Sequence, residues 1–339
     1  MSSTPHDPST DTDTDPNPGP ALSPVIDAVA IGRNEGQRLI GCLDSLKAAG
    51  LRHVVYVDSG STDGSLAEAQ ARGAIVVELD MSQPFTAARA RNAGVAALPQ
   101  GADYIQFIDG DCTIEAEWVP LAADFLTDNP IVAAVCGRLR EIDPEASIYN
   151  RMIDHEWDTP LGQTRACGGI VMMRAAHFHE AGGFKPELIA GEEPELCVRL
   201  RRAGWQIWRL DAEMARHDAA IHRFGQWWRR RRRTGYAYAE GAALHGAPPE
   251  RHNVAQTRRA LAWGLGLPVL ALLGTFLINP VFLLLFLAWP AQILRLSWRD
   301  GDLTHAGFLT LGKIPEAFGV IEYWFRRLVG RDGRLIEYK

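Results

Sequence analysis

The most constraining feature of this sequence is an uncharged stretch of 35 residues, 260–294. A single membrane-crossing helix needs about 20 apolar residues at about 1.5 Å each, so the stretch is too long for one helix and fits two short ones. Asn279-Pro280 lies at its middle, where proline favours a turn. The stretch therefore predicts a hydrophobic helical hairpin over residues 258–298, which either crosses a membrane twice or is re-entrant.

The charges around this stretch indicate how the hairpin is oriented. Arginines flank both of its ends, and the positive-inside rule then places both ends on the cytoplasmic side. The alternative is a buried helical pair in a soluble core, but the run is nearly continuous rather than amphipathic, which favours a membrane. Residues 300–339 return to a helical spacing of apolar and basic side chains. We expect them to form an amphipathic segment at the membrane surface.

Composition and charge distribution add four expectations. The formal net charge of −6 gives no reason to expect a nucleic-acid partner. Residues 1–23 are mostly Ser, Thr, Asp and Pro, so we expect a disordered tail without a signal peptide. The five cysteines form no CxxC pair, which favours reduced thiols in a cytosolic compartment. The five consecutive arginines at 229–233 lie about 25 residues before the hairpin, and we expect them to contact the membrane surface.

Residues 24–250 are predicted to form an α/β domain. Short apolar segments, the expected strands, alternate in its first half with helical patterns at 36–48, 63–72 and 86–97. This alternation predicts a Rossmann-like, mostly parallel sheet flanked by helices. No dinucleotide-binding or P-loop glycine motif is present at a strand-to-helix turn. The expected strands are 27–31, 53–57, 74–78, 104–108 and 131–137.

Polar residues follow three of these strands. Asn34 and Glu35 come after the first strand, and Asp58 and Ser59 follow the second. In open sheets of this kind, ligands bind beyond the carboxyl ends of the strands. Asp58, at its strand terminus, is placed to accept a hydrogen bond from the N–H of a nucleotide base. We therefore expect these four residues at a ligand site, although the same segments also suit capped strand-to-helix turns.

The third polar group is Asp109-Gly110-Asp111, after the strand 104–108. A spacing of two residues places both carboxylates on one side, and glycine leaves room for a close ligand. Paired carboxylates suit Mg²⁺ or Mn²⁺, which prefer oxygen ligands and often bridge to phosphates. By itself the triplet is as typical of a turn as of a metal site. Its position on the same predicted sheet edge as Asp58 favours the metal site.

Five motifs, taken in the order in which they occur along the chain, resemble those of the family 2 glycosyltransferases with the GT-A fold. The resemblance covers roughly residues 25–245. The resemblance implies an inverting transferase that uses a nucleotide-diphosphate sugar, commonly UDP-linked, together with a divalent cation, Mg²⁺ or Mn²⁺. It implies that Asp58 contacts the base, that Arg91 lines the nucleotide site, and that Asp109 and Asp111 form the metal-binding triplet. The motifs are Ile31-Gly-Arg-Asn-Glu35, Val57-Asp-Ser-Gly-Ser-Thr-Asp-Gly64, Ala90-Arg-Asn-Ala-Gly94, Ile108-Asp-Gly-Asp-Cys112 and Gly191-Glu-Glu-Pro-Glu-Leu196.

The resemblance also suggests a general base. The family usually places a Glu-Asp pair at the start of a helix, and the matching pair here is Glu192-Glu193. Glu193 then takes the role of the base, which removes the proton of the acceptor hydroxyl as the sugar carbon is attacked. Glu192 and Glu195 remain alternatives, because glutamate is longer than aspartate. All three acids also suit the positive end of a helix dipole without any catalytic role.

Three further residues are weaker candidates. Gly168 and Gly169 precede an apolar strand and are expected to line the sugar pocket, although a close-packed turn explains them equally well. A histidine near position 217 is sometimes a further metal or diphosphate ligand in GT-A enzymes, so His217 joins the metal candidates.

The hairpin adds an expected acceptor and location. A membrane-anchored site suggests a lipid, lipid-linked or cell-surface glycan acceptor. We expect the inner (cytoplasmic) membrane of a bacterial-type cell, with the catalytic domain facing the cytoplasm. Two other classes remain: a sugar nucleotidyltransferase, which needs a glycine-rich basic loop after the first strand, and a non-catalytic membrane scaffold. The scaffold has no reason to keep Asp58, Asp109, Asp111 and Glu193 together.

Overall fold

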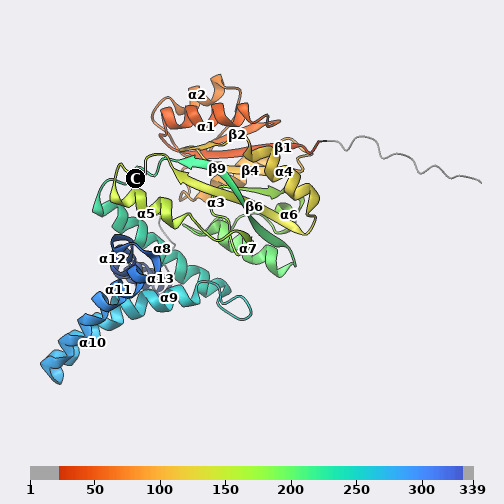
Figure 1. The fold of residues 1–339 in the computed structure, drawn as a ribbon. Helices are drawn as coiled ribbons and strands as arrows, with labels where there is room; N and C mark the ends of the chain where they lie inside the picture. The colour runs from red at the N-terminus through yellow and green to blue at the C-terminus, as the bar shows by residue number, and fades with distance from the viewer. Residues whose placement is uncertain (1–22, 331–339) are drawn as a thin grey trace, which may run out of the picture.

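The computed structural model describes residues 23–330, which form a sheet domain and a separate group of helices (Figure 1). The predicted N-terminal tail, apart from residue 23, and residues 331–339 of the predicted C-terminal segment lie outside the described residues. The described strands join one sheet. They are β1 (Ile26–Gly32), β2 (Val54–Asp58), β3 (Ile75–Glu78), β4 (Tyr104–Asp109), β5 (Cys112–Ile114), β6 (Val132–Glu141), β7 (Gly162–Thr164), β8 (Val171–Arg174) and β9 (Gln206–His217).

The sheet has the strand order β3-β2-β1-β4-β8-β6-β9-β5, and β7 pairs with β9. The strands β3, β2, β1 and β4 are parallel neighbours, which confirms the predicted parallel sheet with crossover helices for this half. The other half is mixed. Strand β8 lies antiparallel between β4 and β6, so the strand predicted at 131–137 does not adjoin β4. Strand β8, four residues long, is the apolar strand predicted to follow Gly169.

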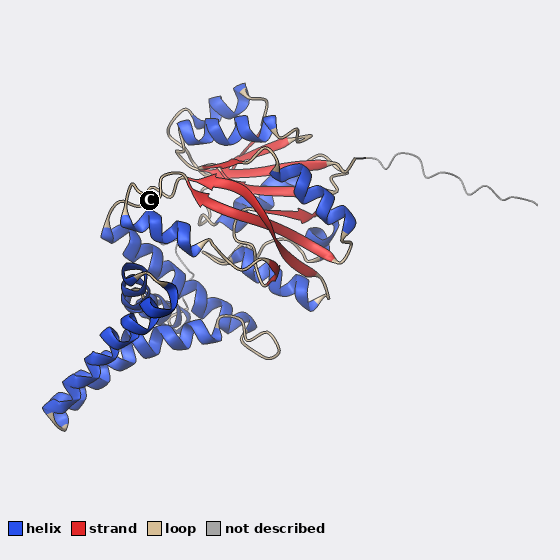
Figure 2. Cartoon of the chain, in the orientation of Figure 1, coloured by secondary structure: helices blue, strands red, loops and turns tan. Residues whose placement is uncertain are grey.

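Helices cover both faces of the sheet (Figure 2). One core contains side chains of α1 (Gln37–Ala48), α2 (Ser65–Ala71) and α4 (Trp118–Asp128). The core on the opposite face contains side chains of α3 (Ala87–Ala97), α6 (Ala175–Glu180) and α7 (Glu192–Arg202). Helix α3 approaches the sheet closely at Gly94, where a Cβ atom would lie 2.3 Å from the side chain of Val29. This contact fixes the height of α3 above the sheet, and with it the position of Arg91.

The remaining helices form a C-terminal unit below the sheet domain (Figure 1). Helix α8 packs along α13, and the two backbones touch at Gly235 and Gly319, where an added Cβ would collide with the backbone of the partner helix. Helix α5 (Ile148–Glu156) contributes Tyr149 to an aromatic contact with Trp227 of α8. The helices of the unit are α8 (Phe224–His245), α9 (Val254–Leu261), the π-helix η1 (Ala262–Gly266), α10 (Leu267–Leu277), the 3₁₀ segment η2 (Pro280–Leu287), α11 (Ala288–Asp300), α12 (Leu303–Leu311) and α13 (Lys313–Leu328).

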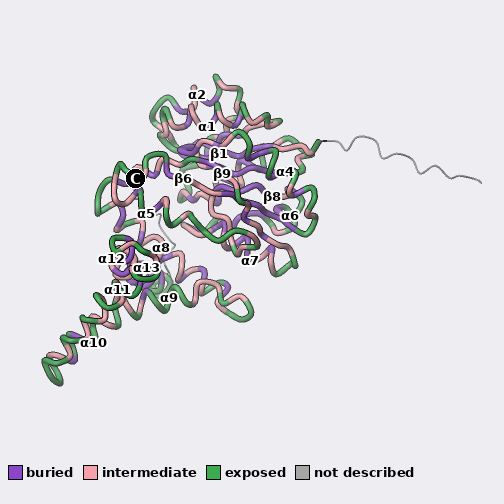
Figure 3. Tube along the Cα trace, viewed as in Figure 1, coloured by how far each residue is buried: buried purple, intermediate pink, exposed green. Residues whose placement is uncertain are grey.

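The predicted hairpin is present and projects from this unit. Two helical segments, Val254–Leu277 and Pro280–Asp300, are long and apolar enough to cross a membrane by length and composition. They turn at Asn279, as predicted from Asn279-Pro280. The alternative of a pair buried in a soluble core is wrong, because the apolar windows of the two segments are only 17% and 0% buried. Figure 3 shows the hairpin, mostly exposed or half-buried, projecting away from the buried strands.

We predicted that the arginine run contacts the membrane surface. In the structure most of the run is instead packed against other parts of the chain. Arg231 is buried and forms an ion pair with Glu316 of α13. Arg230 pairs with a carboxylate of α5, Arg232 pairs with one of α13, and Arg233 donates to a backbone carbonyl. Within the run, only Arg229 is classed as exposed. The run therefore serves mainly to join α8 to its neighbours. The sequence did not reveal this because the partner acids lie 74 to 90 residues away.

A candidate glycosyltransferase active site

The loops after β1 and β2 are tied to each other at the carboxyl edge of the sheet. The backbone N–H of Asn34 donates to Ser61 Oγ at 2.9 Å, and the Asn34 side chain accepts from the N–H of Thr62 at 2.7 Å. Asn34 adopts a left-handed backbone conformation with φ of 56°, which asparagine tolerates well. Glu35 pairs with Arg38 at 2.7 Å. These contacts hold both loops beside the same strand ends.

Asp58 is buried and its carboxylate builds the second loop. One oxygen accepts from the Tyr56 hydroxyl at 3.1 Å, and the other accepts from the N–H groups of Gly60 and Ser61 at 3.0 and 2.8 Å. Ser59 is also buried, and its hydroxyl has no hydrogen-bond partner within the described residues. Asp58 therefore shapes the loop, and the Ser59 hydroxyl is buried beside it.

Arg91 joins two of the predicted site acids. Its buried guanidinium donates to Asp109 Oδ1 at 2.7 Å and forms an ion pair with Glu192 Oε1. The Asp109 side chain is 38% exposed, so it borders solvent while Arg91 does not. Arg91 comes from α3, Asp109 ends β4, and Glu192 opens α7. Three elements far apart in the sequence thus meet in one charged group.

The glycine loop before β8 lies against this group. A Cβ atom added to Gly169 would lie 2.7 Å from an Arg91 nitrogen and 3.5 Å from an Asp109 oxygen. The adjacent N–H groups of Cys167 and Gly168 donate to the Glu193 carboxylate at 2.9 and 2.8 Å. Gly168 has φ of 102°, a conformation that strongly favours glycine. The structure therefore brings Gly168, Gly169 and Glu193 together beside Arg91 and Asp109.

Glu193 differs from its neighbours in its surroundings. It is buried, and it forms no ion pair with a cation among the described residues. Burial raises the pKa of its carboxyl group, and the hydrogen bonds from Cys197, Cys167 and Gly168 only partly oppose this effect. Glu195 is also buried, but it binds Arg199, His245 and Lys185 and points away into the helix packing. Its contacts are those of a structural residue.

Asp111 and His217 form a second group. Asp111 Oδ2 and His217 Nε2 are 3.3 Å apart, and the Cys112 thiol completes a set of possible ligand atoms that all lie within 4.8 Å of one another. Asp109 does not belong to this set because its carboxylate contacts Arg91, and its role as a joint metal ligand with Asp111 stays a prediction. The chain turns at Gly110, and β5 then pairs with β9, with Cys112 opposite His217. This pairing carries Asp111 toward His217 and leaves Asp109 over Arg91.

The donor atoms of this group fit a divalent cation. His217 Nδ1 is buried without a hydrogen-bond partner among the described residues, and burial lowers the pKa of the imidazole, which favours the neutral form that binds metals. Burial raises the pKa of the Cys112 thiol well above its usual range, so it stays protonated and is a poor ligand. Carboxylate and imidazole ligands suit Mn²⁺. Trp157, which sequence reasoning missed, packs edge-on against the His217 ring at 4.9 Å.

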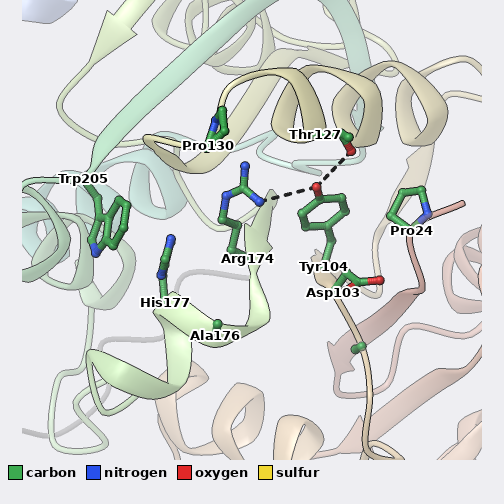
Figure 4. Close-up of a pocket in the computed structure, with 10 residues that line it drawn as sticks. Pro24, Asp103, Tyr104, Thr127, Pro130, Arg174, Ala176, His177 and Trp205 are labelled. Atoms are coloured by element: carbon green, nitrogen blue, oxygen red, sulfur yellow. Dashed lines mark hydrogen bonds between the residues drawn. The ribbon is translucent and has the colours of Figure 1, made fainter. Parts of the chain in front are cut away.

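A pocket of about 530 Å³ lies elsewhere, at the opposite edge of the sheet (Figure 4). Tyr104 begins β4 and Arg174 ends the antiparallel β8, so both lie at the amino edge of the parallel strands. The Arg174 guanidinium is occupied by backbone carbonyls such as that of Val132. None of the predicted site residues lines this pocket. The pocket is therefore distant from the candidate active site, and its residues can serve as control positions for substitutions.

Comparison with known proteins shows which families and relatives this chain resembles. Residues 29–179 match the family model described as glycosyl transferase family 2, and residues 151–223 match the model described as N-terminal domain of galactosyltransferase. The pre-mycofactocin glycosyltransferase of Mycobacterium tuberculosis is 27% identical over 55% of this chain and 41% of its own length. The succinoglycan biosynthesis protein ExoA of Rhizobium meliloti is 29% identical over 47% of this chain and 51% of its own length. The chain thus spans about half the length of the curated relatives it matches.

The fold also resembles a solved structure. The mannosyltransferase PcManGT from Pyrobaculum calidifontis, solved with GDP-Man and Mn²⁺, superposes with a TM-score of 0.64 over 90% of this chain and 88% of that chain, at 16% identity. At this identity the likeness shows the fold alone. The mixed sheet with flanking helices is a GT-A fold, and residues 29–179 match the glycosyl transferase family 2 model.

Proposed function

We propose that this protein is a membrane-associated, metal-dependent, inverting glycosyltransferase of the hexosyltransferase type. It transfers a sugar from a nucleotide-diphosphate donor, with UDP-sugars as the first candidates, to a lipid, lipid-linked or cell-surface glycan acceptor. The observation that carries this proposal is the meeting, at one edge of the sheet, of the Arg91–Asp109–Glu192 group with the loop held by Glu193. The Asp111–His217 pair lies at the same edge.

The two groups have different roles in this proposal. Asp111 and His217 would hold the Mg²⁺ or Mn²⁺ ion, whose charge offsets that of the departing diphosphate. Asp109 and Arg91 would border the sugar and the diphosphate, because Asp109 is half-exposed and Arg91 fixes its orientation. The loop residues Asn34, Glu35, Asp58 and Ser59 would form the nucleotide end of the site.

Glu193 is the proposed base, and Glu192 its positioning neighbour. Inversion in a single displacement needs a carboxylate that accepts the proton of the acceptor hydroxyl. A raised pKa brings a carboxyl group closer to the operating pH of such a base. In the described structure the Glu193 carboxylate accepts from the N–H groups of Cys167 and Gly168, and Oε2, which accepts only from Gly168, can accept a further hydrogen bond from the acceptor hydroxyl. Gly168 and Gly169 would then line the sugar pocket.

The arrangement of the C-terminal unit supports a membrane acceptor. Helix α8 begins at Phe224, seven positions after His217, and runs into the unit that carries the hairpin. The site is therefore close in the chain to the exposed apolar segments. One relative carries the name of a polysaccharide biosynthesis protein, which fits a glycan or lipid-linked acceptor. We place the protein at the inner membrane of a bacterial-type cell, with its catalytic domain facing the cytoplasm.

Release of nucleoside diphosphate tests the proposal. The full chain in detergent is incubated with a panel of UDP- and GDP-sugars, with Mn²⁺ or with EDTA. We expect release with Mn²⁺ only, and a loss of about 100-fold or more in Asp111→Asn and in His217→Ala. His177→Ala is the matched control, because this histidine lines the pocket at the opposite sheet edge. Release that survives EDTA and both site substitutions would contradict the proposed metal site.

A further inference from the structure

We propose that the hairpin is re-entrant: its tip ends inside the bilayer, among the acyl chains, and both arms return to the side from which they entered. This inference rests on the membrane association in the proposed function and goes beyond it. According to this inference, lipid acyl chains cover the exposed apolar surface of α10 and η2. The argument uses the length of the projecting segment, the chemistry of its tip and the residues at its base.

The projecting part of the hairpin is too short to cross a bilayer. The first arm packs on α13 along α9 and η1, and its main partner beyond Gly266 is the second arm. The part beyond is α10, whose 11 residues span about 16 Å. On the return, η2 has 8 residues and spans about 16 Å at 3₁₀ spacing. A hydrocarbon core is about 30 Å thick, so 16 Å reaches roughly its middle.

The tip carries no charged residue for the far side of a membrane, and Asn279 is its one exposed polar side chain among residues 276–282. Phe276, Leu277 and Ile278 are 83%, 78% and 73% exposed, and the nearest charged residues are Arg259 and Arg295. A hairpin that crossed twice would place these side chains in water or among headgroups. Exposed large apolar side chains at a turn are instead expected where the surroundings are acyl chains.

The backbone N–H groups at the tip find partners within the hairpin. The N–H groups of Ile278 and Asn279 both donate to the carbonyl of Gly274, at 3.0 and 2.9 Å. The N–H of Val281 donates to the Asn279 side chain at 2.9 Å, and that of Phe282 donates to the Asn279 carbonyl at 3.1 Å. Pro280 has no N–H group. A turn can stay in hydrocarbon only if its backbone groups find partners, and these four donors need no water.

The base of the hairpin has the composition of a membrane interface. The four flanking arginines are all exposed, and so are Trp298 at 93% and Trp324 at 43%. Tryptophan and arginine concentrate at the level of the headgroups. Helix α13 turns one face to α8 and an opposite apolar face to solvent, which agrees with an interfacial helix at this level. The flanking arginines are Arg258, Arg259, Arg295 and Arg299.

Cysteine accessibility in spheroplasts and inverted vesicles tests the inference. The full chain carries either Ile278→Cys at the tip or Gln256→Cys, an exposed position on α9 at the base. The five native cysteines are buried or partly buried, so the unsubstituted chain gives the background. With a charged maleimide, we expect Gln256→Cys to react in inverted vesicles. We expect Ile278→Cys to stay at background from both sides and to react at least about tenfold more after detergent is added.

Each other outcome overturns the inference in a recognisable way. Labelling of Ile278→Cys from outside spheroplasts means that the hairpin crosses twice. Labelling from the same side as Gln256→Cys means that the tip is not inserted. Oxidative cross-linking of Ile278→Cys to a second copy in the membrane means that another chain, not lipid, covers the tip. Vesicle flotation separates this inference from the function: a chain that does not float contradicts membrane association itself, while a floating chain with an accessible tip contradicts only re-entry.

Discussion

At the scale of single residues, Glu192 and Glu193 are neighbours with different surroundings. Glu192 is ion-paired with Arg91, whereas Glu193 is held by backbone N–H groups and has a pKa raised by burial. We expect Glu193→Gln to lower kcat by about 100-fold or more with donor binding preserved, because only the base is removed. Glu192→Gln is expected to weaken donor binding instead, since Arg91 loses a partner. Steady-state kinetics and donor titration of the two variants distinguish these effects.

The pH profile gives a second readout of the same prediction. A base must be ionised, so the wild-type kcat/KM falls as pH drops through the raised pKa of Glu193. In Glu193→Gln the residual activity should no longer show this acidic limb. An unchanged acidic limb in that variant would assign the base to another carboxylate.

At the scale of elements, helix α8 contains Glu240, whose carboxyl group is largely buried and therefore unfavourable to ionise. Burial raises the pKa of Glu240 to about 7, and the nearby Glu187 adds to the shift. Below its ordinary pKa the group is protonated in both folded and unfolded chains and has no effect on the free energy of unfolding. As pH rises through about 7 the folded chain must ionise a buried acid, so stability is lost. We expect Glu240→Gln to be roughly 2–3 kcal/mol more stable than wild type at pH 8, with a much smaller difference at pH 5.

Thermal unfolding in detergent at both pH values measures this difference. Glu322→Gln is the opposing control, because its carboxylate pairs with Arg232 and Arg326 and its removal should lower stability. Equal Tm gains for Glu240→Gln at pH 5 and pH 8 would show that ionisation is not the cause.

At the scale of the whole molecule, an ion network connects α5 to the C-terminal unit. Arg231 of α8 pairs with Glu316 of α13 and with Glu156 of α5, and Lys313 also binds Glu316 at 2.7 Å. Glu316 is fully buried. Removing one partner of a buried pair leaves an uncompensated charge, so we expect Glu316→Gln to destabilise the chain by about 3–5 kcal/mol.

The measurement is again the unfolding transition in detergent. Glu145→Gln breaks the exposed pair with Arg151 and is the matched control, for which we expect no measurable change. A transition of Glu316→Gln that coincides with that of wild type would mean that this buried pair does not stabilise the packing of α8 on α13.

Local patterns in the sequence were sufficient for much of the fold. The strands β1 to β4 lie within two residues of their predicted ranges, because apolar runs bounded by turns are read from neighbouring residues alone. The hairpin and its turn at Asn279 were predictable from the uncharged run alone, because the two apolar segments are not buried in a core formed by distant residues. The sequence also indicated that the loops after β1, β2 and β4 share one edge, since parallel strands impose this.

Tertiary structure alone decided which side chains meet. Asp109 and Asp111 are two residues apart, yet the turn at Gly110 and the pairing of β5 with β9 direct Asp111 to His217 and leave Asp109 with Arg91. Likewise, the acids that neutralise Arg231 lie 75 and 85 residues away along the chain. Hydrophobic periodicity encodes elements and their exposed faces, but a contact between charged groups depends on how distant elements pack. For this protein the sequence therefore determined the architecture and the edge that carries the site, and the packing determined the partners within it.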